Sequence, residues 1–421
     1  MRILYLHQHF SVPAGSVATR SHAMARALAA RGHAVTIACG RYDGAVSGLD
    51  GPFRHGRRSG RVNGFSVVEF DIACGNHLGL AARSLAFLAF AARAMPLALS
   101  RHYDLVIASS TPLTVAVPAL VARRLRGTPF VFEIRDPWPE LPRALLRAQG
   151  AAKRLPRMLL AMMEPLANDA CRNATAVIAL SEGMAETAIM RGADPARVHV
   201  VPNGCDLDLF GPHIAPWRPA EAQPWECLAV YAGAHGPANG LDRLLDAAAL
   251  LRDEATLRIL LVGEGAEKQR LIARARAEGL ANVTFLGPMP KTSLATLLAG
   301  CQIGVHMLEE VPHFAEWTSP NTLMDYLAAG LPVVTNVAGH AARLIEGGAT
   351  PCGIAAMPGD VAALAAALRT LATDPVRRGE MGRNARAQAV RRWDRRLLAA
   401  QFCEVAERAI ATPPRTVLAM P

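Results

Sequence analysis

The segment from Trp317 to Asn336 (WTSPNTLMDYLAAGLPVVTN) has the residue types and spacing of an anion-binding helix start. A serine followed by a proline favours the start of a helix, and Gly330 favours its end, directly before a short apolar strand. In a parallel sheet this order turns the free backbone amides of the helix toward the crevice at the strand ends, where an anion is stabilised. The expected ligand groups are Ser319, Pro320, Asn321 and Thr322, with the acid Asp325 one turn further on. An ordinary helix and strand with the same caps is the alternative that this segment alone leaves open.

A second group of chemically active side chains follows the apolar run of VFEIRDPWPELP, residues 131–142. The run predicts a buried strand, so Arg135 and Asp136 would stand on the loop at its carboxyl end, where doubly wound folds bind ligands. The alternative is a local role, in which Trp138 packs nearby and Asp136 caps the next turn.

Glycine-containing turns between a strand and a helix occur at several further places. Glycine lets the backbone approach a phosphate closely, and the helix that follows supplies amide donors. Arg20 follows the first of these turns, and a plain surface position is the alternative to ligand binding for its side chain. The candidate ligand residues in the turns are Gly15, Ser16, Gly233, His235, Glu264, Gly265 and Gly287.

Short apolar runs alternate with amphipathic helices along the chain, a pattern typical of α/β folds with parallel sheets. The 421 residues exceed the size of a single core, and a polar, proline-rich segment at about 208–225 predicts a linker between two halves. We expect Rossmann-like domains at 1–207 and 226–390, followed by a C-terminal helix at 391–411 that could pack back on the first domain. The predicted strands are 3–6, 35–38, 65–70, 105–108, 130–133, 176–179, 198–201, 227–231, 257–262, 283–286, 302–306 and 332–335.

Positive charge is concentrated in the first half. The whole chain has a net charge of +10, and residues 1–205 hold 24 basic against 13 acidic residues. This excess indicates an anionic partner, either nucleic acid or an anionic membrane surface, unless it is only an arginine-rich composition. No nucleic-acid-binding module is recognised, so we do not expect nucleic acid. The eight cysteines show no metal-ligand spacing, which predicts reduced core residues and no metal.

Two stretches could meet a membrane. Residues 78–99 are long enough for a span, but Arg83, Arg93 and Pro96 interrupt them, so we expect a helix buried on the fold with one face at the bilayer interface. Residues 142–167 mix arginine and lysine with leucine and methionine, which is typical of an interfacial helix. A simple solvated helix is the alternative. The first residues run directly into a strand without a signal peptide, so export is not expected.

Taken together, these motifs resemble the retaining family-4 glycosyltransferases of the GT-B fold, and most closely bacterial O-antigen and capsule polysaccharide glycosyltransferases such as fucosamine transferases. The resemblance implies two Rossmann-like domains facing across a cleft. It also implies that Asp325 holds the ribose of the donor and that Arg135 and Asp136 orient the transferred sugar and the acceptor. The chain departs from the family pattern where relatives carry cations or an acid that contact the donor. The residues at these positions are Ala234, Asn239, Trp317 and Thr322.

The resemblance predicts transfer of a hexose or an N-acetylated amino sugar from a nucleoside-diphosphate donor, with UDP as the expected nucleotide, to a lipid-linked saccharide acceptor. It implies retention of configuration and no cofactor. The expected setting is bacterial surface polysaccharide biosynthesis, including lipopolysaccharide, capsule or exopolysaccharide. The enzyme would be cytoplasmic and peripheral on the inner face of the cytoplasmic membrane. Two alternatives stay open: a UDP-sugar 2-epimerase of the same fold, and a catalytically silent protein that binds polysaccharide intermediates.

Overall fold

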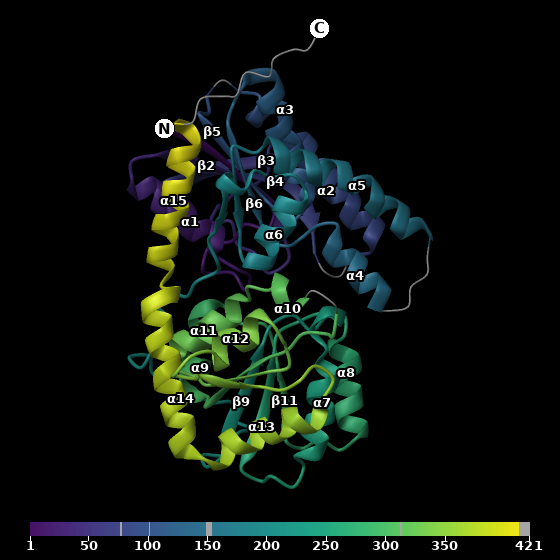
Figure 1. The fold of residues 1–421 in the computed structure, drawn as a ribbon, viewed down its shortest axis with the longest axis vertical. Helices are drawn as coiled ribbons and strands as arrows, with labels where there is room; N and C mark the ends of the chain where they lie inside the picture. Colours follow the sequence, from purple (N-terminus) through teal and green to yellow (C-terminus); the bar gives the residue numbers. More distant parts are fainter. Residues whose placement is uncertain (76–77, 101, 149–153, 312–313, 412–421) are drawn as a thin grey trace.

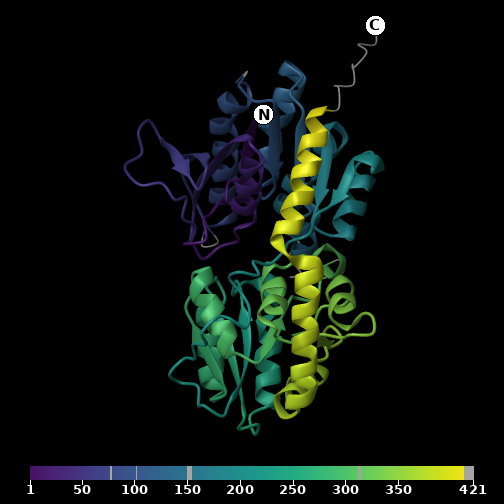
Figure 2. The same ribbon diagram turned by 90° about the vertical axis from the view of Figure 1, so that its left-hand side faces the viewer.

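The computed structural model describes residues 1–75, 78–100, 102–148, 154–311 and 314–411, which form two lobes stacked along the long axis (Figure 1). Each lobe is a wholly or mostly parallel sheet covered by helices on both faces, so the described residues confirm the predicted α/β class. The last two long helices run along one side of the molecule, the first on the lower lobe and the second on the upper lobe (Figure 2).

The N-terminal lobe is built on a sheet with the strand order β3-β4-β2-β1-β5-β6-β7-β8. Its pairs are parallel except for the hairpin of β3 and β4, which is antiparallel. The central strands are buried along their whole length, as expected for a parallel sheet that is covered on both sides. The strands are β1 (Arg2–Leu6), β2 (Ala34–Tyr42), β3 (Arg57–Val62), β4 (Phe65–Cys74), β5 (Leu105–Ser109), β6 (Phe130–Ile134), β7 (Ala176–Ala179) and β8 (Val198–Val200).

The C-terminal lobe contains a second, wholly parallel sheet with the order β11-β10-β9-β12-β13-β14. In chain order within the lobe this is 3-2-1-4-5-6, the arrangement of dinucleotide-binding folds. The strands are β9 (Cys227–Ala232), β10 (Leu257–Val262), β11 (Val283–Leu286), β12 (Ile303–His306), β13 (Val333–Thr335) and β14 (Gly353–Ala355).

Helices cover both faces of each sheet. In the first lobe, α1 and α15 share one core with the sheet, while α2, α3 and α5 pack into the core on the other face. In the second lobe, α7 and α13 cover one face, and α9, α11 and α14 cover the other. The helices are α1 (Arg20–Ala30), α2 (Leu80–Ala98), α3 (Ala116–Arg126), α4 (Glu140–Ala148), α5 (Arg154–Asn173), α6 (Glu182–Met190), α7 (Leu241–Leu250), α8 (Lys268–Ala277), α9 (Lys291–Gly300), α10 (Phe314–Trp317), α11 (Asn321–Ala329), α12 (His340–Glu346), α13 (Val361–Thr373), α14 (Pro375–Gln388) and α15 (Arg395–Ala411).

The predicted strands are confirmed, and the structure adds β3 and β14. Strand β3 (RRSGRV) escaped the sequence analysis because four of its six residues are polar or charged, and it forms only by pairing with β4. Strand β14 is a three-residue edge strand that depends on its parallel contact with β13. Both strands are therefore decided by their neighbours rather than by their own composition.

Helix α15 joins the two lobes by crossing from the second to the first. It packs along α1, and its Phe402 ring stacks on Tyr5 of the central strand with 6.0 Å between ring centroids. The backbone amide of Cys205, where the chain leaves the first lobe, donates to the Trp393 carbonyl at 2.8 Å, and the amide of Arg395 donates back to the Cys205 carbonyl at 2.9 Å. The outgoing and returning chains thus cross between the lobes as a pair.

Helix α2 is the one described helix whose length and composition would allow it to span a membrane, over Ala81–Ala98. Its inner face, with Phe87, Phe90 and Ala94, is buried against the first lobe. Its outer face presents Leu85 and Leu88, which are 69% and 59% exposed. The helix is therefore amphipathic within the fold.

Candidate functional site

The two sheets open toward each other at the points where their strand order reverses. In the first lobe the reversal lies between β1 and β5, and in the second it lies between β9 and β12. Loops that leave the carboxyl ends of two such strands diverge to opposite faces of the sheet and leave a crevice for ligands. Residues from both reversal points line two cavities between the lobes, including His9 and Thr111 from the first lobe and Gly233 and His306 from the second.

The larger cavity has a volume of about 940 Å³ and is walled mainly by the second lobe. The first lobe contributes the loop of Ser16 and the loop of Asp43, while the start of α11 forms part of the wall. Seven residues predicted to hold a donor line this cavity: Ser16, Gly233, Glu264, Gly265, Pro320, Asn321 and Thr322.

The glycine turns of the second lobe are built by a close approach of two backbones. The amide of His235 donates to the Glu264 carbonyl at 2.8 Å, and the amide of Glu267 donates to the His235 carbonyl at 2.9 Å. A Cβ atom at Gly265 would collide with the His235 carbonyl oxygen, so only glycine permits this pairing. The two turns therefore form one rigid edge of the larger cavity.

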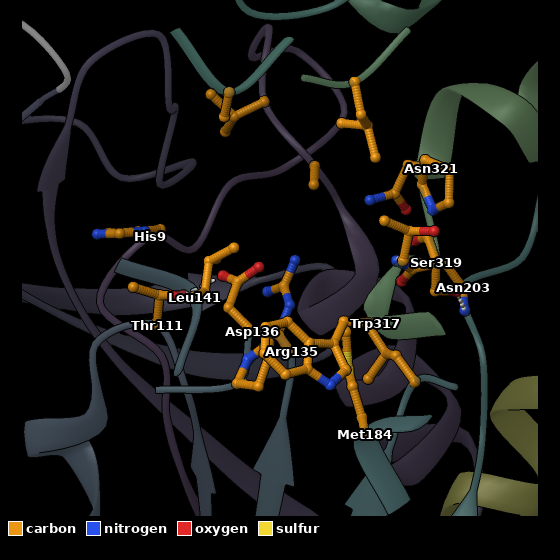
Figure 3. Close-up of a pocket in the computed structure, with 18 of the residues that line it drawn as sticks. His9, Thr111, Arg135, Asp136, Leu141, Met184, Asn203, Trp317, Ser319 and Asn321 are labelled. Carbon is orange, nitrogen blue, oxygen red and sulfur yellow. Dashed lines mark hydrogen bonds between the residues drawn. The ribbon is translucent and has the colours of Figure 1, made fainter. Parts of the chain in front are cut away.

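The smaller cavity, of about 460 Å³, lies against the first lobe (Figure 3). Arg135, Asp136 and Thr111 stand on one side of it, and Asn321 and Ser319 face them from the second lobe. Asp136 and Asn321 line both cavities, so they stand where the two spaces meet. The apolar part of the wall is formed by Leu141, Leu180, Met184 and Trp317, together with smaller side chains.

Arg135 and Asp136 are held in place by neighbours from the first lobe. The Arg135 guanidinium donates to Nε2 of His7 at 2.6 Å, which leaves Nδ1 of the imidazole as the donor to the Ser21 hydroxyl at 2.8 Å. Burial and the neighbouring Arg135 lower the pKa of His7 well below its usual value, so the ring stays neutral and can accept this bond. Asp136 accepts a hydrogen bond from the Thr111 hydroxyl.

The start of α11 differs from the prediction. The helix begins at Asn321, and Ser319 does not cap it with its side chain. Instead, the Ser319 hydroxyl accepts a hydrogen bond from the backbone amide of Asn203 at 3.0 Å, and the Asn203 side chain donates to the Ser319 carbonyl. Ser319 therefore links the helix start to the segment that leaves the first lobe, and the amides at the beginning of α11 stay available to the cavity.

Arg20 does not contact either cavity, which corrects the prediction of a donor ligand. Its side chain is buried, and its Nε donates to Glu133 at 2.8 Å. Its two terminal nitrogens donate to the carbonyls of Pro202 and Val201 at 2.6 and 2.8 Å. Burial alone would raise the pKa of Glu133, but Arg20 and Arg135 outweigh it and hold that pKa below its usual value. Arg20 acts as a structural cation beneath the site.

Gly15, His235 and Gly287 also lie outside the two cavity linings. Gly15 is packed against the backbone of Gly44, and Gly287 is exposed beside Pro288 and Met289, which do line the larger cavity. The His235 ring is fully buried between Tyr231 and Phe285. Burial lowers its pKa to about 4, so the ring is neutral at physiological pH.

Asp325 is fully buried beneath the larger cavity, and its carboxylate accepts a hydrogen bond from Lys291, which does line that cavity. Burial raises the pKa of Asp325, and the neighbouring Lys291 opposes this shift. The structure thus places Asp325 against Lys291, and its contact with a ribose stays a prediction.

Both halves of the chain match known family models. Residues 15–204 match the model described as "Glycosyl transferase 4-like domain", and residues 226–374 match the one described as "Glycosyl transferases group 1". The chain belongs to the family-4 glycosyltransferases. Its two facing Rossmann-like lobes form the GT-B fold.

Individual relatives of this chain are distant. It is 33% identical over 219 residues to a D-inositol 3-phosphate glycosyltransferase of Gordonia bronchialis, covering 49% of this chain and 46% of that protein. The chain spans about half the length of the first curated relatives that it matches. Sucrose-phosphate synthase of Thermosynechococcus elongatus superposes with a TM-score of 0.75 at 18% identity, covering 97% of this chain and 99% of that one. Anabaena HepE, solved with UDP-glucose, superposes with a TM-score of 0.67 at 21% identity, covering 97% and 100%.

The family acid that would stand eight residues before Asp325 is replaced by Trp317, which lines the smaller cavity. Its neighbour Glu316 does not take over, because its carboxylate is turned to the exposed Arg343 at 2.6 Å. Its backbone carbonyl faces the first lobe, where it accepts a hydrogen bond from the Ser181 hydroxyl at 2.8 Å. This chain thus presents an aromatic ring at this position.

Sequence reasoning missed several side chains that line the cavities, among them His9, Lys291 and His306. Burial lowers the pKa of His9 to about 3 and that of His306 to about 4, so both rings are neutral, and Nε2 of each has no partner among the described residues. Their positions in the sequence could have indicated both histidines. His9 follows the buried strand β1 and His306 ends the buried strand β12, so both lie at the carboxyl edge of a sheet. No spacing rule pointed to Lys291.

We expect Arg20→Met to destabilise the N-terminal lobe by about 3–5 kcal/mol, because it leaves the Glu133 carboxylate buried without its cation. Urea unfolding followed by fluorescence would measure the loss. Arg31→Met is the matched control, since the Arg31–Glu407 pair is about one-third exposed on both sides and should contribute about 0–1 kcal/mol. Equal losses in the two variants would contradict the structural role of Arg20.

The neutral buried histidines predict a pH-dependent stability. In the unfolded chain, histidine takes up a proton near pH 6.5, whereas the folded rings of His9, His235 and His306 have pKa values of about 3 to 4. The unfolded state therefore binds more protons between these pH values, and the stability of the fold decreases as the pH decreases through this window. Each ring contributes a slope of about 1.4 kcal/mol per pH unit there. His235→Phe should remove one such slope from urea unfolding measured at pH 7, 6 and 5. The exposed His102→Phe is the control, and an unchanged slope in His235→Phe would refute this assignment.

Proposed function

We propose that this protein is a retaining glycosyltransferase that moves a hexose or an N-acetylated amino sugar from a nucleoside-diphosphate donor, UDP-linked, to a lipid-linked saccharide acceptor. The reaction would belong to bacterial surface polysaccharide biosynthesis at the cytoplasmic face of the membrane. In this proposal, residues 226–390 bind the nucleotide-sugar and residues 1–207 face the acceptor and the membrane. The C-terminal helix at 391–411 fastens the two together.

The observation that carries the proposal is the pair of cavities that meet at Asp136 and Asn321. The larger cavity combines glycine turns with the amides at the start of α11, a combination suited to a diphosphate. Its size also suits a nucleotide-sugar. Anabaena HepE, which shares the fold, was solved with UDP-glucose, and this supports a UDP-linked donor.

The proposed reaction breaks the bond between the anomeric carbon and the β-phosphate oxygen, and the bonding electrons leave with the diphosphate. The acceptor hydroxyl forms the new bond to the same carbon, on the face from which the diphosphate leaves, and its proton passes to the Asp136 carboxylate. Backbone amides at the start of α11 would stabilise the charge that grows on the diphosphate, as preorganised dipoles do. Asp136 stands at the junction of the two cavities, where the acceptor hydroxyl and the sugar would meet, and Arg135 fixes the loop that presents it.

The smaller cavity supports the proposed class of sugar. Trp317, Met184 and Leu180 pack together and form an apolar part of its wall. An N-acetyl methyl group or the apolar face of a hexose ring would pack against this wall and shield it from water, which is favourable. The polar side with Asp136, Thr111 and His9 would bind hydroxyl groups.

The surface of the first lobe supports a membrane-bound acceptor. The outer face of α2 presents Leu85 and Leu88, while the exposed Arg93 of the same helix donates to the His55 carbonyl at 3.4 Å. Helices α2, α4 and α5 lie on one side of this lobe (Figure 1). The predicted interfacial stretch at 142–167 falls partly outside the described residues, and Lys153 lies outside them. Basic and apolar side chains together favour an anionic bilayer surface.

The reaction is tested by measuring UDP release from UDP-glucose and UDP-N-acetylglucosamine with and without a polyprenyl-diphosphate-linked sugar. We expect release with acceptor, and Asp136→Asn should lower kcat about 100-fold because it removes a carboxylate from the junction of the cavities. Glu316→Gln, an acid at the same lobe interface that is turned to Arg343, should stay within twofold. Conversion of the donor sugar without acceptor would instead indicate an epimerase. Binding without turnover would indicate the silent relative that the residues Ala234 and Asn239 leave open.

Membrane binding is tested by sedimentation with vesicles that contain phosphatidylglycerol. We expect Leu85→Asp combined with Leu88→Asp to lower the bound fraction at least fivefold, since the change removes about 1.5–3 kcal/mol of apolar burial for each leucine. Leu250→Asp, at a 55% exposed position on the second lobe, is the matched control. Equal binding by all three proteins would exclude α2 as the membrane face.

A further inference from the structure

Lys291 is an unusual cation in this chain. The sequence contains three lysines among its 45 basic residues, and arginine is used at every other basic position. Lys291 is the first residue of α9 and is only 8% exposed, yet it lines the larger cavity. A lysine presents a compact ammonium that fits a tight space, whereas arginine presents a broad planar fork.

The Lys291 ammonium is held in position from beneath. One of its hydrogens is donated to the Asp325 carboxylate, and its nitrogen lies 5.4 Å from the centroid of the Phe210 ring. An ammonium carries three hydrogens, so two are left to point elsewhere. Asp325 is fully buried, and neither Asp325 nor Phe210 lines either cavity. Of these three residues, only Lys291 contacts the larger cavity.

The larger cavity otherwise lacks basic side chains. Among its lining residues in the described part of the chain, Lys291 is the only lysine or arginine, while Asp43, Asp136 and Glu264 are acidic. The residues at the three positions where family members usually carry a cation are Ala234, Asn239 and Thr322. Lys268, the other lysine nearby, is bound to the carbonyls of Gly263 and Leu286 and to Glu264. A diphosphate in this cavity therefore has one basic side chain within its walls.

We propose that Lys291 binds the diphosphate of the donor and that Asp325 acts as the positioning residue that orients it. The inference rests on the proposed nucleotide-sugar function. In this proposal, Lys291 at the start of α9 supplies the positive charge that is missing from the glycine turn. It also gives the buried acid a role through the lysine instead of a contact with the ribose.

The test compares the binding of UDP with that of uridine, by titration calorimetry for UDP and by ligand-observed NMR for uridine. Lys291→Met should weaken UDP at least tenfold and change uridine less than twofold, because the lost interaction is with the phosphates. Arg270→Met removes a positive charge from the same lobe at an exposed pair with Asp242 and should leave both affinities unchanged. The uridine titration also counts the folded sites in each variant, so a folding defect is separated from a binding defect.

The role of Asp325 is tested by a double-mutant cycle on the same two ligands. Asp325→Asn should weaken UDP at least threefold when Lys291 is present, and it should have less than a 1.5-fold effect in the Lys291→Met background. A carboxylate that contacted the ribose would instead weaken uridine and UDP alike in both backgrounds, and this result would overturn the proposal.

The outcomes also separate this inference from the proposed function. If the wild type binds and releases UDP while Lys291→Met binds UDP within twofold of it, the role of Lys291 is refuted and the glycosyltransferase activity stands. If the wild type binds no UDP and releases none from any donor, the proposed function itself fails.

Discussion

The buried ion pair of Arg20 and Glu133 is the interaction on which the rest of the site depends. Glu133 also accepts the hydroxyls of Tyr5 and Ser109 at 3.0 and 2.5 Å. Arg20 donates in addition to two carbonyls where the chain leaves β8. One pair therefore joins α1, β1, β5, β6 and the exit toward the second lobe. Taking two charges out of water is costly, and the cost is offset here because nearly every polar atom of the pair has a partner.

This pair sets the distance between the two halves of the site. The segment that Arg20 fixes continues into Asn203, which binds Ser319 at the start of α11. Helix α6 adds a second contact through Ser181 and the Glu316 carbonyl, where a Cβ atom at Gly183 would be too close. The returning chain adds a third contact, because Cys205 pairs with Trp393 and with Arg395 at the start of α15. These contacts are short and polar, and they face the two sheet reversal points toward each other across the cavities.

The cavities rely on backbone dipoles, amides and neutral rings more than on charged side chains. Ala234 and Asn239 leave the glycine turn, and Thr322 leaves the start of α11, without the cations that the family pattern implies, and Trp317 stands in place of an acid. Arg135 on the first lobe and Lys291 on the second are the lysine or arginine residues that line the cavities within the described residues. Each is held by a fixed partner, His7 or Asp325. Such preorganised groups need little rearrangement when charge develops on a leaving diphosphate.

The sequence by itself determined the α/β class, most of the strands and the loops that would approach the cavity, because apolar periodicity and glycine turns are local signals. It also placed Arg135, Asp136 and Asn321 at strand or helix ends, and the structure puts all three in the cavity walls.

Only the tertiary structure decided which polar residues face the cavity and which lie beneath it. Arg20, His235 and Asp325 follow the same local patterns, yet each is buried against a partner from a distant segment, such as Glu133 at 113 positions from Arg20. Ser319 was expected to cap its own helix and instead binds Asn203, 116 residues away. Burial and partner choice depend on the packing of segments far apart in the chain, and a local pattern carries no record of that packing.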